Sequence, residues 1–321
     1  MYSGYITDVE GIKVGHSQSS EGMTGCTVVI CEDGATAGVD VRGSAPGTRE
    51  TDLLNAEKMV NKIHAVLLSG GSAFGLDAAG GVMKFLEDKK IGFDVGVTKV
   101  PIVSGAVIFD LDIGDYSIRP NFNMGYLAAK NAKEEEKSQG NIGCGMGATV
   151  GKILGPEYSM KSGIGSASMN IGNLWVGAII AVNSFGDVYD YETNNILAGA
   201  YDYKNKKLLN SYEIMKEEKN SKDFSIKNTT IGVVATNGIL YKPESNKVAQ
   251  MAQNGLARSI NPIHTMYDGD TIFTMSTGKI KSDVNLIGTL SSEVVSRAIT
   301  NAILSTNSYK NILSYEDLKR C

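Results

Sequence analysis

The segment NTTIGVVATN, residues 228–237, places two threonines directly before a run of apolar residues. The residues that precede it, 203–228, are polar and rich in lysine, whereas Ile231, Val233 and Val234 are typical of a buried strand. A polar loop therefore runs straight into a strand whose first residues carry hydroxyl groups. We expect a strand of the hydrophobic core to begin at this junction.

Thr229 has the sequence surroundings that an N-terminal nucleophile requires. In such enzymes a hydroxyl at the rigid end of a strand attacks its own preceding carbonyl, an N-to-O acyl shift gives an ester, and water hydrolyses that ester. The freed α-amine, with an unperturbed pKa of ~7.7–8.0, then serves as general base for the hydroxyl. Two other interpretations stay open, because Asn-Thr-Thr also fits a glycosylation sequon and paired threonines are common at strand starts.

The rest of the chain predicts a mixed α/β protein. Apolar runs rich in β-branched residues predict further strands at 26–31, 65–68 and 176–182. Apolar residues at helical spacing predict helices at 51–63, 76–86, 247–259 and 290–304. Glycine is abundant, with 37 residues against 6 prolines, which favours a sheet-rich core with many tight turns. Strands in two sets with helices outside suggest a layered helix–sheet–sheet–helix sandwich.

Composition argues against several kinds of partner and site. The formal net charge of −4 gives no basic field for nucleic acid or anionic lipid, so neither is expected as a partner. No apolar stretch reaches the ~18 residues that span a bilayer. The first residues lack the basic and apolar regions of a secretory signal, so a cytoplasmic location is expected. The four cysteines and three histidines are scattered, so no metal or other cofactor is predicted.

A second polar group is the segment DGDT, residues 268–271. A glycine separates Asp268 from Asp270, so a tight turn could point both carboxylates to one site, where like-charge repulsion would raise the pKa of one of them. There they could orient a threonine hydroxyl and its ammonium group. A plain β-turn explains the same spacing, and from spacing alone it is the better explanation. An EF-hand is excluded because its further oxygen ligands and terminal glutamate are missing.

Two single residues complete the candidate site. Lys152 ends a glycine-rich stretch, but Ile153 follows it where a phosphate-binding loop has serine or threonine, so nucleotide binding is not expected. Asn183 directly follows a predicted strand, where a side-chain amide can donate to an oxyanion. Both residues also fit ordinary surface positions at strand ends.

Taken together, these segments resemble the L-aminopeptidase/D-esterase family of self-processing hydrolases, which includes β-aminopeptidases and 6-aminohexanoate-oligomer (nylon oligomer) hydrolases. The resemblance covers nearly the whole chain, and its matching segments are, in order, residues 11–16, 39–43, 70–75, 103–110, 143–152, Asn183, 228–237, 268–273 and 290–304. Within the family the sequence looks most similar to the nylon-oligomer branch, because it shares Asn-Thr-Thr and Asp-Gly-Asp. Aminopeptidase relatives tend to carry a serine nucleophile and a Ser-x-Glu pair at these places.

The resemblance implies a role for each candidate residue. Thr229 would be the nucleophile, with Asn228 on the departing side of the cut. Asp268 and Asp270 would orient and polarise Thr229. Cleavage would divide the chain into residues 1–228 and 229–321.

The family pattern also implies that Lys152 and Asn183 help to hold the site and the oxyanion. This sequence departs from the pattern at one position, where Phe109 replaces the active-site tyrosine of a Ser-Ala-Val-Ile-Tyr-Asp segment. A hydroxyl that could bond to substrate or oxyanion is therefore absent. We expect the change at this substrate-binding position to affect rate and substrate preference more than reaction class.

The fold that the resemblance implies is an αββα four-layer sandwich, shared with ornithine acetyltransferases and typically assembled into homotetramers. It would be a single domain, residues 1–321, that cuts itself into the two chains given above. The expected substrates are small linear amides or peptides, with no cofactor. Two alternatives stay open. One is acyl transfer like that of ornithine acetyltransferases, which also use a self-generated threonine, and the other is a non-catalytic relative that never cleaves.

Overall fold

Strand β16, Thr229–Gly238, begins where the sequence predicts a core strand, and all of its residues are buried. The computed structural model describes residues 1–217 and 228–319. Strand β16 pairs antiparallel with β11, Leu174–Asn183, and parallel with β18, Thr271–Ile280. The candidate nucleophile therefore lies at the end of a strand that has neighbours on both sides.

The strands form two layers that share the long strand β2, Thr24–Val41. The first layer runs β10-β11-β16-β18 and ends on the second half of β2, with β10 at Ile164–Ile171. A register shift in β2 separates that half from the first half, which belongs to the second layer. The other strands of the second layer are β1 at Lys13–Ser19, β4 at Lys62–Ser69, β7 at Val103–Val107 and β3 at Thr48–Arg49.

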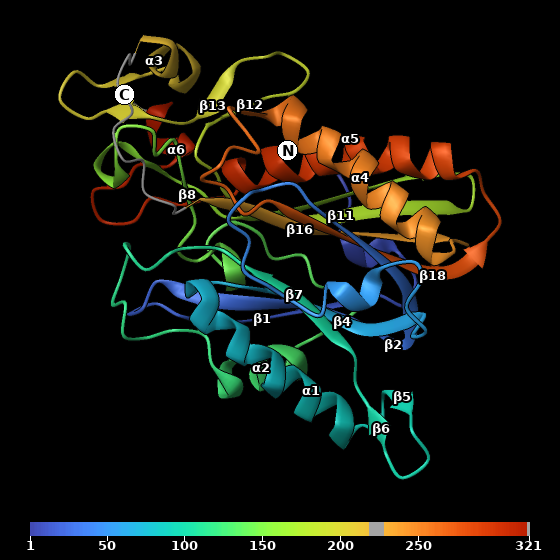
Figure 1. Ribbon diagram of the computed structural model, residues 1–321. Coiled ribbons are helices and arrows are strands. Elements are labelled where there is room, and N and C mark those ends of the chain that lie inside the picture. Colours follow the sequence, from blue (N-terminus) through green and yellow to red (C-terminus); the bar gives the residue numbers. More distant parts are fainter. Residues whose placement is uncertain (218–227, 320–321) are drawn as a thin grey trace.

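Helices cover the outer face of each layer (Figure 1). Helices α4, Lys242–Ser259, and α5, Val284–Leu304, lie on the first layer, and α1, Ala78–Asp88, and α2, Phe122–Lys130, lie on the second. The short strands are β5 Phe93–Asp94, β6 Lys99–Val100, β8 Thr149–Val150, β9 Met160–Lys161, β12 Asp187–Tyr189, β13 Ile196–Ala198, β14 Tyr201–Asp202, β15 Lys207–Leu208 and β17 Ile260–Asn261. The short helices are α3 Ser211–Glu217 and α6 Tyr315–Leu318, with 3-10 turns at Ile6–Asp8, Asp52–Leu54, Ser72–Asp77, Gly143–Gly145 and Pro156–Tyr158.

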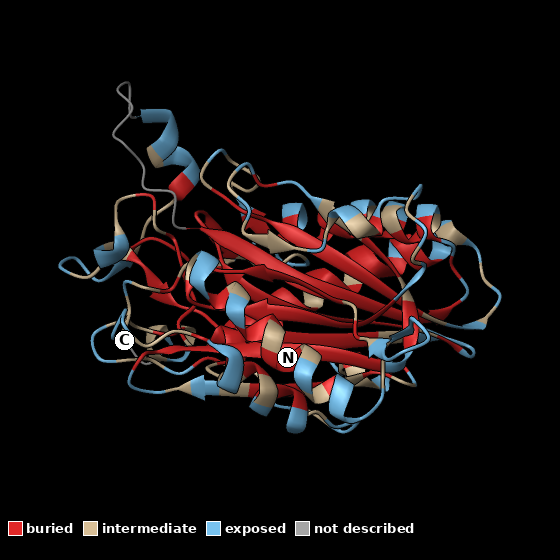
Figure 2. Cartoon of the chain, turned by 60° about the horizontal axis from the view of Figure 1, so that its bottom comes forward, coloured by how far each residue is buried: buried red, intermediate tan, exposed pale blue. Residues whose placement is uncertain are grey.

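Alternation along the strands explains the layers. In β11, Ala178, Ile180 and Val182 pack against residues of α4 and α5, whereas Ile179 and Ala181 belong to the core between the two sheets. Because both faces of these strands are covered, they are continuously apolar in sequence. Figure 2 shows the buried strands enclosed by helices whose outer faces are exposed. The predicted αββα sandwich is confirmed.

The predicted helix at 51–63 is wrong. Only a 3-10 turn forms at its start, Asp52–Leu54, and its end belongs to strand β4, which begins at Lys62. Leu54 is buried, but Met59, which lies in the same predicted apolar stripe, is 80% exposed. Most helical stability in proteins comes from packing one apolar face, and the members of this stripe are not buried together, since Leu54 and Ile63 lie in the core and Met59 lies at the surface.

The three other predicted helices are confirmed, although two of them begin earlier than predicted. Helix α4 starts at Lys242, and the Glu244 carboxylate accepts from the backbone N–H of Tyr241 at 2.7 Å. Helix α5 starts at Val284, where Asp283 caps it by accepting from the Asn285 N–H at 3.0 Å. The first turn of α4 is polar, so the apolar periodicity does not reveal it. The first turn of α5 carries Val284, Leu286 and Ile287, so its start is apolar and the prediction simply began too late.

The polar segment predicted at 203–228 contains strand β15 and helix α3 in its described part. Its remainder, 218–227, lies outside the described residues. Among the helices that the structure describes, none combines the length and apolar character needed to cross a bilayer.

Candidate active site

Thr229 is buried at the first position of β16, with 6% of its surface exposed. Its hydroxyl donates to the carbonyl oxygen of Asn228, at the bond where cleavage is predicted. The same carbonyl accepts from the backbone N–H of Gly269 at 3.0 Å. The carbonyl is thus held between the hydroxyl and a backbone donor, and such a donor stabilises negative charge on a carbonyl oxygen that is attacked.

Glycine is required at position 269 because the backbone there approaches the nucleophile closely. A Cβ atom on Gly269 would lie 2.9 Å from Thr229 Oγ1 and 2.8 Å from the carbonyl oxygen of Ala45. The segment containing Ala45 also binds the Asp-Gly-Asp turn through backbone hydrogen bonds. The Arg42 N–H donates to the Asp270 carbonyl at 2.9 Å, and the Ala45 N–H donates to the Asp268 carbonyl at 2.9 Å. The turn is therefore fixed by its backbone.

Asp268 is fully buried beside this turn. Its Oδ2 accepts from the backbone N–H of Thr265 at 2.8 Å and from the Thr265 hydroxyl at 2.6 Å. Burial raises the pKa of Asp268 to about 6, helped by the negative charge of Asp270 and opposed by the two hydrogen bonds from Thr265. This carboxyl can therefore gain or lose a proton near neutral pH.

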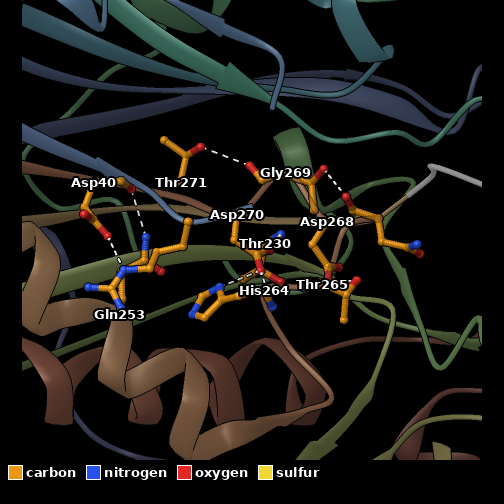
Figure 3. Close-up of polar contacts among 12 residues, drawn as sticks. Asp40, Thr230, Gln253, His264, Thr265, Asp268, Gly269, Asp270 and Thr271 are labelled. Carbon is orange, nitrogen blue, oxygen red and sulfur yellow. Dashed lines mark hydrogen bonds and ion pairs between the residues drawn. The ribbon is translucent and has the colours of Figure 1, made fainter. Parts of the chain in front are cut away.

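Asp270 joins the turn to the start of β16. Its Oδ1 accepts from the Thr230 N–H at 2.7 Å, in the peptide unit that directly follows Thr229. Its Oδ2 accepts from the backbone N–H of His264 at 3.2 Å and lies 2.9 Å from Nδ1 of the His264 ring. Figure 3 shows His264, Thr230 and Asp270 in this arrangement, with Asp268 and Thr265 beside them. Both oxygens of Asp270 are engaged.

Lys152, Asn183 and Phe109 form a connected group beside Thr229. Asn183 is paired with Thr229 across the β11–β16 ladder and is fully buried. Lys152 Nζ donates to Asn183 Oδ1 at 2.8 Å and to its carbonyl at 3.1 Å. Asn183 Nδ2 donates to the Phe109 carbonyl at 2.9 Å. The interpretation of Asn183 as a surface residue at a strand end is thereby wrong.

Sequence reasoning missed the residues that hold the two carboxylates. His264 and Thr265 stand directly before the aspartates in the segment HTMYDGD, so proximity in sequence is the signal that could have indicated them. Their role depends on how the turn folds back, because His264 adopts a positive φ of 57°. That backbone conformation cannot be deduced from periodicity.

A buried lysine near the site was also missed. Lys161 is fully buried, and its Nζ donates to the carbonyls of Ala148 at 2.8 Å and Ser162 at 2.5 Å. Burial lowers the pKa of Lys161 to about 7, opposed by the negative charge of Asp110 and helped by the positive charge of Lys152. Lys161 thus holds the loop that ends at Ala148. The next residue, Thr149, donates its N–H to Asn183 Oδ1 at 3.0 Å. Within the described residues, no three His, Cys, Asp or Glu side chains gather as metal ligands.

The layered fold is shared with solved aminopeptidases. A β-aminopeptidase from Burkholderia sp. superposes with a TM-score of 0.68 at 19% identity, covering 98% of this chain and 93% of that one. The L-aminopeptidase D-Ala-esterase/amidase from Ochrobactrum anthropi superposes with a TM-score of 0.73 at 16% identity, covering 98% and 92%. The latter is described as a variant of the Ntn hydrolase fold, so this chain has the fold of that class.

The family model of peptidase family S58 matches residues 4–313, and the chain belongs to this family. An uncharacterized aminopeptidase of Mycobacterium leprae is 38% identical, with 97% of this chain and 92% of the relative aligned. A 6-aminohexanoate-oligomer endohydrolase of Kocuria sp. is 29% identical over 92% of this chain and 84% of the relative. The predicted family is thereby confirmed, and the protein is a hydrolase acting on amide bonds.

Proposed function

We propose that this protein cuts its own chain between Asn228 and Thr229 and then uses Thr229 as an N-terminal nucleophile to hydrolyse small linear amides. The observation that carries the proposal is the contact of the Thr229 hydroxyl with the Asn228 carbonyl, which the Gly269 N–H also binds at 3.0 Å. The reacting groups of an N-to-O acyl shift are therefore already adjacent in the uncut chain.

Self-cleavage proceeds in two steps. The Thr229 oxygen adds to the carbonyl carbon of Asn228, the peptide C–N bond breaks, and the hydroxyl proton passes to the departing nitrogen. The first step thus frees the α-amine of Thr229, and water then hydrolyses the ester, which leaves a carboxylate on Asn228 and restores the Thr229 hydroxyl. The Gly269 N–H stabilises the oxyanion of the first step.

The two aspartates have different roles in this proposal. Asp270 holds the peptide unit after Thr229 through the Thr230 N–H, so it fixes where the hydroxyl lies. Asp268, with a pKa raised to about 6, is the carboxyl suited to exchange a proton. The amide of Asn183 and the ammonium of Lys152 supply donors next to Thr229, where charge develops during acyl transfer.

The two pieces should stay together after cleavage, because their strands interleave. Strand β16, from the second piece, pairs with β11 of the first piece on one side. Strand β18, also from the second piece, pairs with β2 of the first piece. Separation of the pieces would break both strand pairings and expose the hydrophobic cores on either side of the sheet.

The raised pKa of Asp268 gives a stability prediction. Its pKa is about 6 in the folded chain against 3.8 as the ordinary value, so the folded state binds the proton more tightly. Protonation of Asp268 therefore adds to the free energy of unfolding at acidic pH, and this contribution is lost as the pH rises through about 6. Asp268→Asn, which stays neutral, should therefore raise the melting temperature more at pH 8 than at pH 5.

This comparison is made in the Thr229→Ala chain, so that neither protein is cut. Asp33→Asn, at an exposed position of β2, is the matched control and should show no such difference between the two pH values. An Asp268→Asn effect of equal size at both pH values would contradict the assignment.

Gly269→Ala is expected to slow self-cleavage by at least ~10-fold. The added Cβ would meet Thr229 Oγ1 at 2.9 Å, and a displacement of about 1 Å at reacting atoms can cost up to ~10²-fold in rate. The rate is followed as loss of full-length chain on a denaturing gel after cell-free synthesis. Gly80→Ala, in helix α1, is the control. Unchanged cleavage in Gly269→Ala would show that the close approach is unimportant.

The substrate proposal rests on the relatives, whose names include aminopeptidase and 6-aminohexanoate-oligomer endohydrolase. We propose short peptides, β-peptides, amino-acid amides or 6-aminohexanoate oligomers with a free amine. Phe109, whose carbonyl binds Asn183, makes the site more apolar than a tyrosine would and favours aliphatic spacers. A homo-oligomeric assembly and a cytoplasmic location stay predictions from the sequence.

One panel tests the substrate class. It contains aminoacyl-p-nitroanilides, β-alanyl amides, 6-aminohexanoate oligomers, and N-acetylornithine with glutamate. Hydrolysis of an amide is expected, and the preferred amide identifies the branch. Acetyl transfer to glutamate without amide hydrolysis would instead establish the acetyltransferase alternative.

A further inference from the structure

His264 makes two contacts with the same oxygen of a buried carboxylate. Its backbone N–H lies 3.2 Å and its ring Nδ1 lies 2.9 Å from Asp270 Oδ2. The Asp270 side chain is fully buried, whereas the His264 side chain is 18% exposed. Because a carboxylate only accepts hydrogen bonds, Nδ1 carries the proton in this contact. His264 thus supplies two donors that offset the cost of burying Asp270.

The other oxygen of Asp270 leads to the nucleophile. Oδ1 accepts from the Thr230 N–H at 2.7 Å, and that N–H belongs to the peptide unit joining Thr230 to Thr229. A continuous chain of contacts therefore runs from His264 through Asp270 to the backbone that carries the attacking hydroxyl. Figure 3 shows His264 and Thr230 meeting at the Asp270 carboxylate.

The contacts do not favour His264 as a general base. In a Ser-His-Asp arrangement one ring nitrogen binds the carboxylate and the other binds the nucleophilic hydroxyl. Here Nε2 of His264 is buried without a hydrogen-bond partner in the described part of the chain, and the Thr229 hydroxyl donates to the Asn228 carbonyl. His264 therefore acts through Asp270, not on the reacting atoms.

We infer that His264 is a positioning residue, which locks the Asp270 carboxylate so that it holds the Thr230 N–H and keeps Thr229 aligned for attack. The inference rests on the proposed function, in which Asp270 fixes the position of the nucleophile. Without the hydrogen bond from the His264 ring, the Asp270 carboxylate is held less firmly and can rotate away from the Thr230 N–H. Misplacement of reacting atoms by about 1 Å can lower a rate up to ~10²-fold.

Two substitutions separate the ring donor from the unusual backbone of this residue. His264 has a φ of 57°, a region that asparagine also adopts more readily than most residues. The side-chain NH₂ of His264→Asn can replace the Nδ1–H donor, whereas His264→Ala removes it. If the ring donor is required, His264→Asn should therefore keep self-cleavage and His264→Ala should slow it.

The experiment follows self-cleavage of full-length chains after cell-free synthesis, so it needs no external substrate. His264→Ala should cleave ~10- to ~100-fold more slowly than wild type, and His264→Asn should recover to within ~3-fold of wild type. Melting temperatures of both variants, measured in the Thr229→Ala chain, establish that each is folded. Wild-type cleavage in His264→Ala, or equal slowing in folded His264→Ala and His264→Asn, would overturn the inference.

Asp270→Asn is followed in parallel to distinguish this inference from the function on which it rests. Slow cleavage in Asp270→Asn with normal cleavage in His264→Ala would contradict only the inferred role of His264. Normal cleavage in Asp270→Asn would contradict the proposed role of the Asp270 carboxylate itself.

Discussion

Thr229→Ala is expected to remain a single chain of 321 residues under denaturing conditions and to lack amide hydrolysis altogether. The substitution removes the hydroxyl that, in the proposed mechanism, attacks the Asn228 carbonyl and carries the acyl group. In the uncut chain the α-nitrogen of residue 229 stays in a peptide bond, so it cannot act as a base. Denaturing electrophoresis and an amide-hydrolysis assay check the two parts of this expectation.

The next residue in the chain provides a matched control. Thr230 is also buried in β16, and its hydroxyl has no hydrogen-bond partner among the described residues. Thr230→Val, which keeps the shape and removes that hydroxyl, should therefore cleave and turn over substrate at close to the wild-type rate. Thr229→Ser should also cleave, because serine keeps the hydroxyl. Cleavage of Thr229→Ala would exclude Thr229 as the nucleophile.

Asp268→Ala and Asp270→Ala should each lower turnover by at least ~10²-fold, the scale of a lost acid–base partner or a misplaced nucleophile. The reasons differ between the two positions. Asp268 supplies a carboxyl with a pKa of about 6 beside the turn, and Asp270 anchors the peptide unit after Thr229 through a 2.7 Å hydrogen bond. The measurement is initial-rate kinetics on the preferred amide, with Asp33→Ala as control. Near-normal turnover in both variants would mean that the turn is only structural.

The sequence indicates the strands better than it indicates what holds the site. Runs such as 231–235 are apolar because both faces of the strand are covered, so they are visible without the structure. The stripe at 51–63 is apolar as well, but its residues are not buried together: Leu54 and Ile63 lie in the core and Met59 is exposed. A 3-10 turn and the start of a strand form there in place of the predicted helix. Burial is a property of the whole fold, and periodicity alone cannot supply it.

The candidate residues themselves could be named from the sequence, but not their connections. The pairing of Asn183 with Thr229 depends on the register of β11 against β16. The contacts of His264 depend on a backbone turn with positive φ, and the burial of Lys161 depends on the loop that folds over it. These relations join residues far apart in the chain or use uncommon backbone angles, and no local pattern encodes them.

The N-terminal sequence of the smaller piece is the most direct test of self-cleavage at Thr229. The purified wild-type protein is denatured, its masses are recorded intact, and the smaller component is sequenced from its N-terminus. We expect two components, residues 1–228 and 229–321, the second beginning Thr-Thr-Ile-Gly-Val. A single component with the mass of the full chain, or a second component that begins at any other residue, would contradict the account.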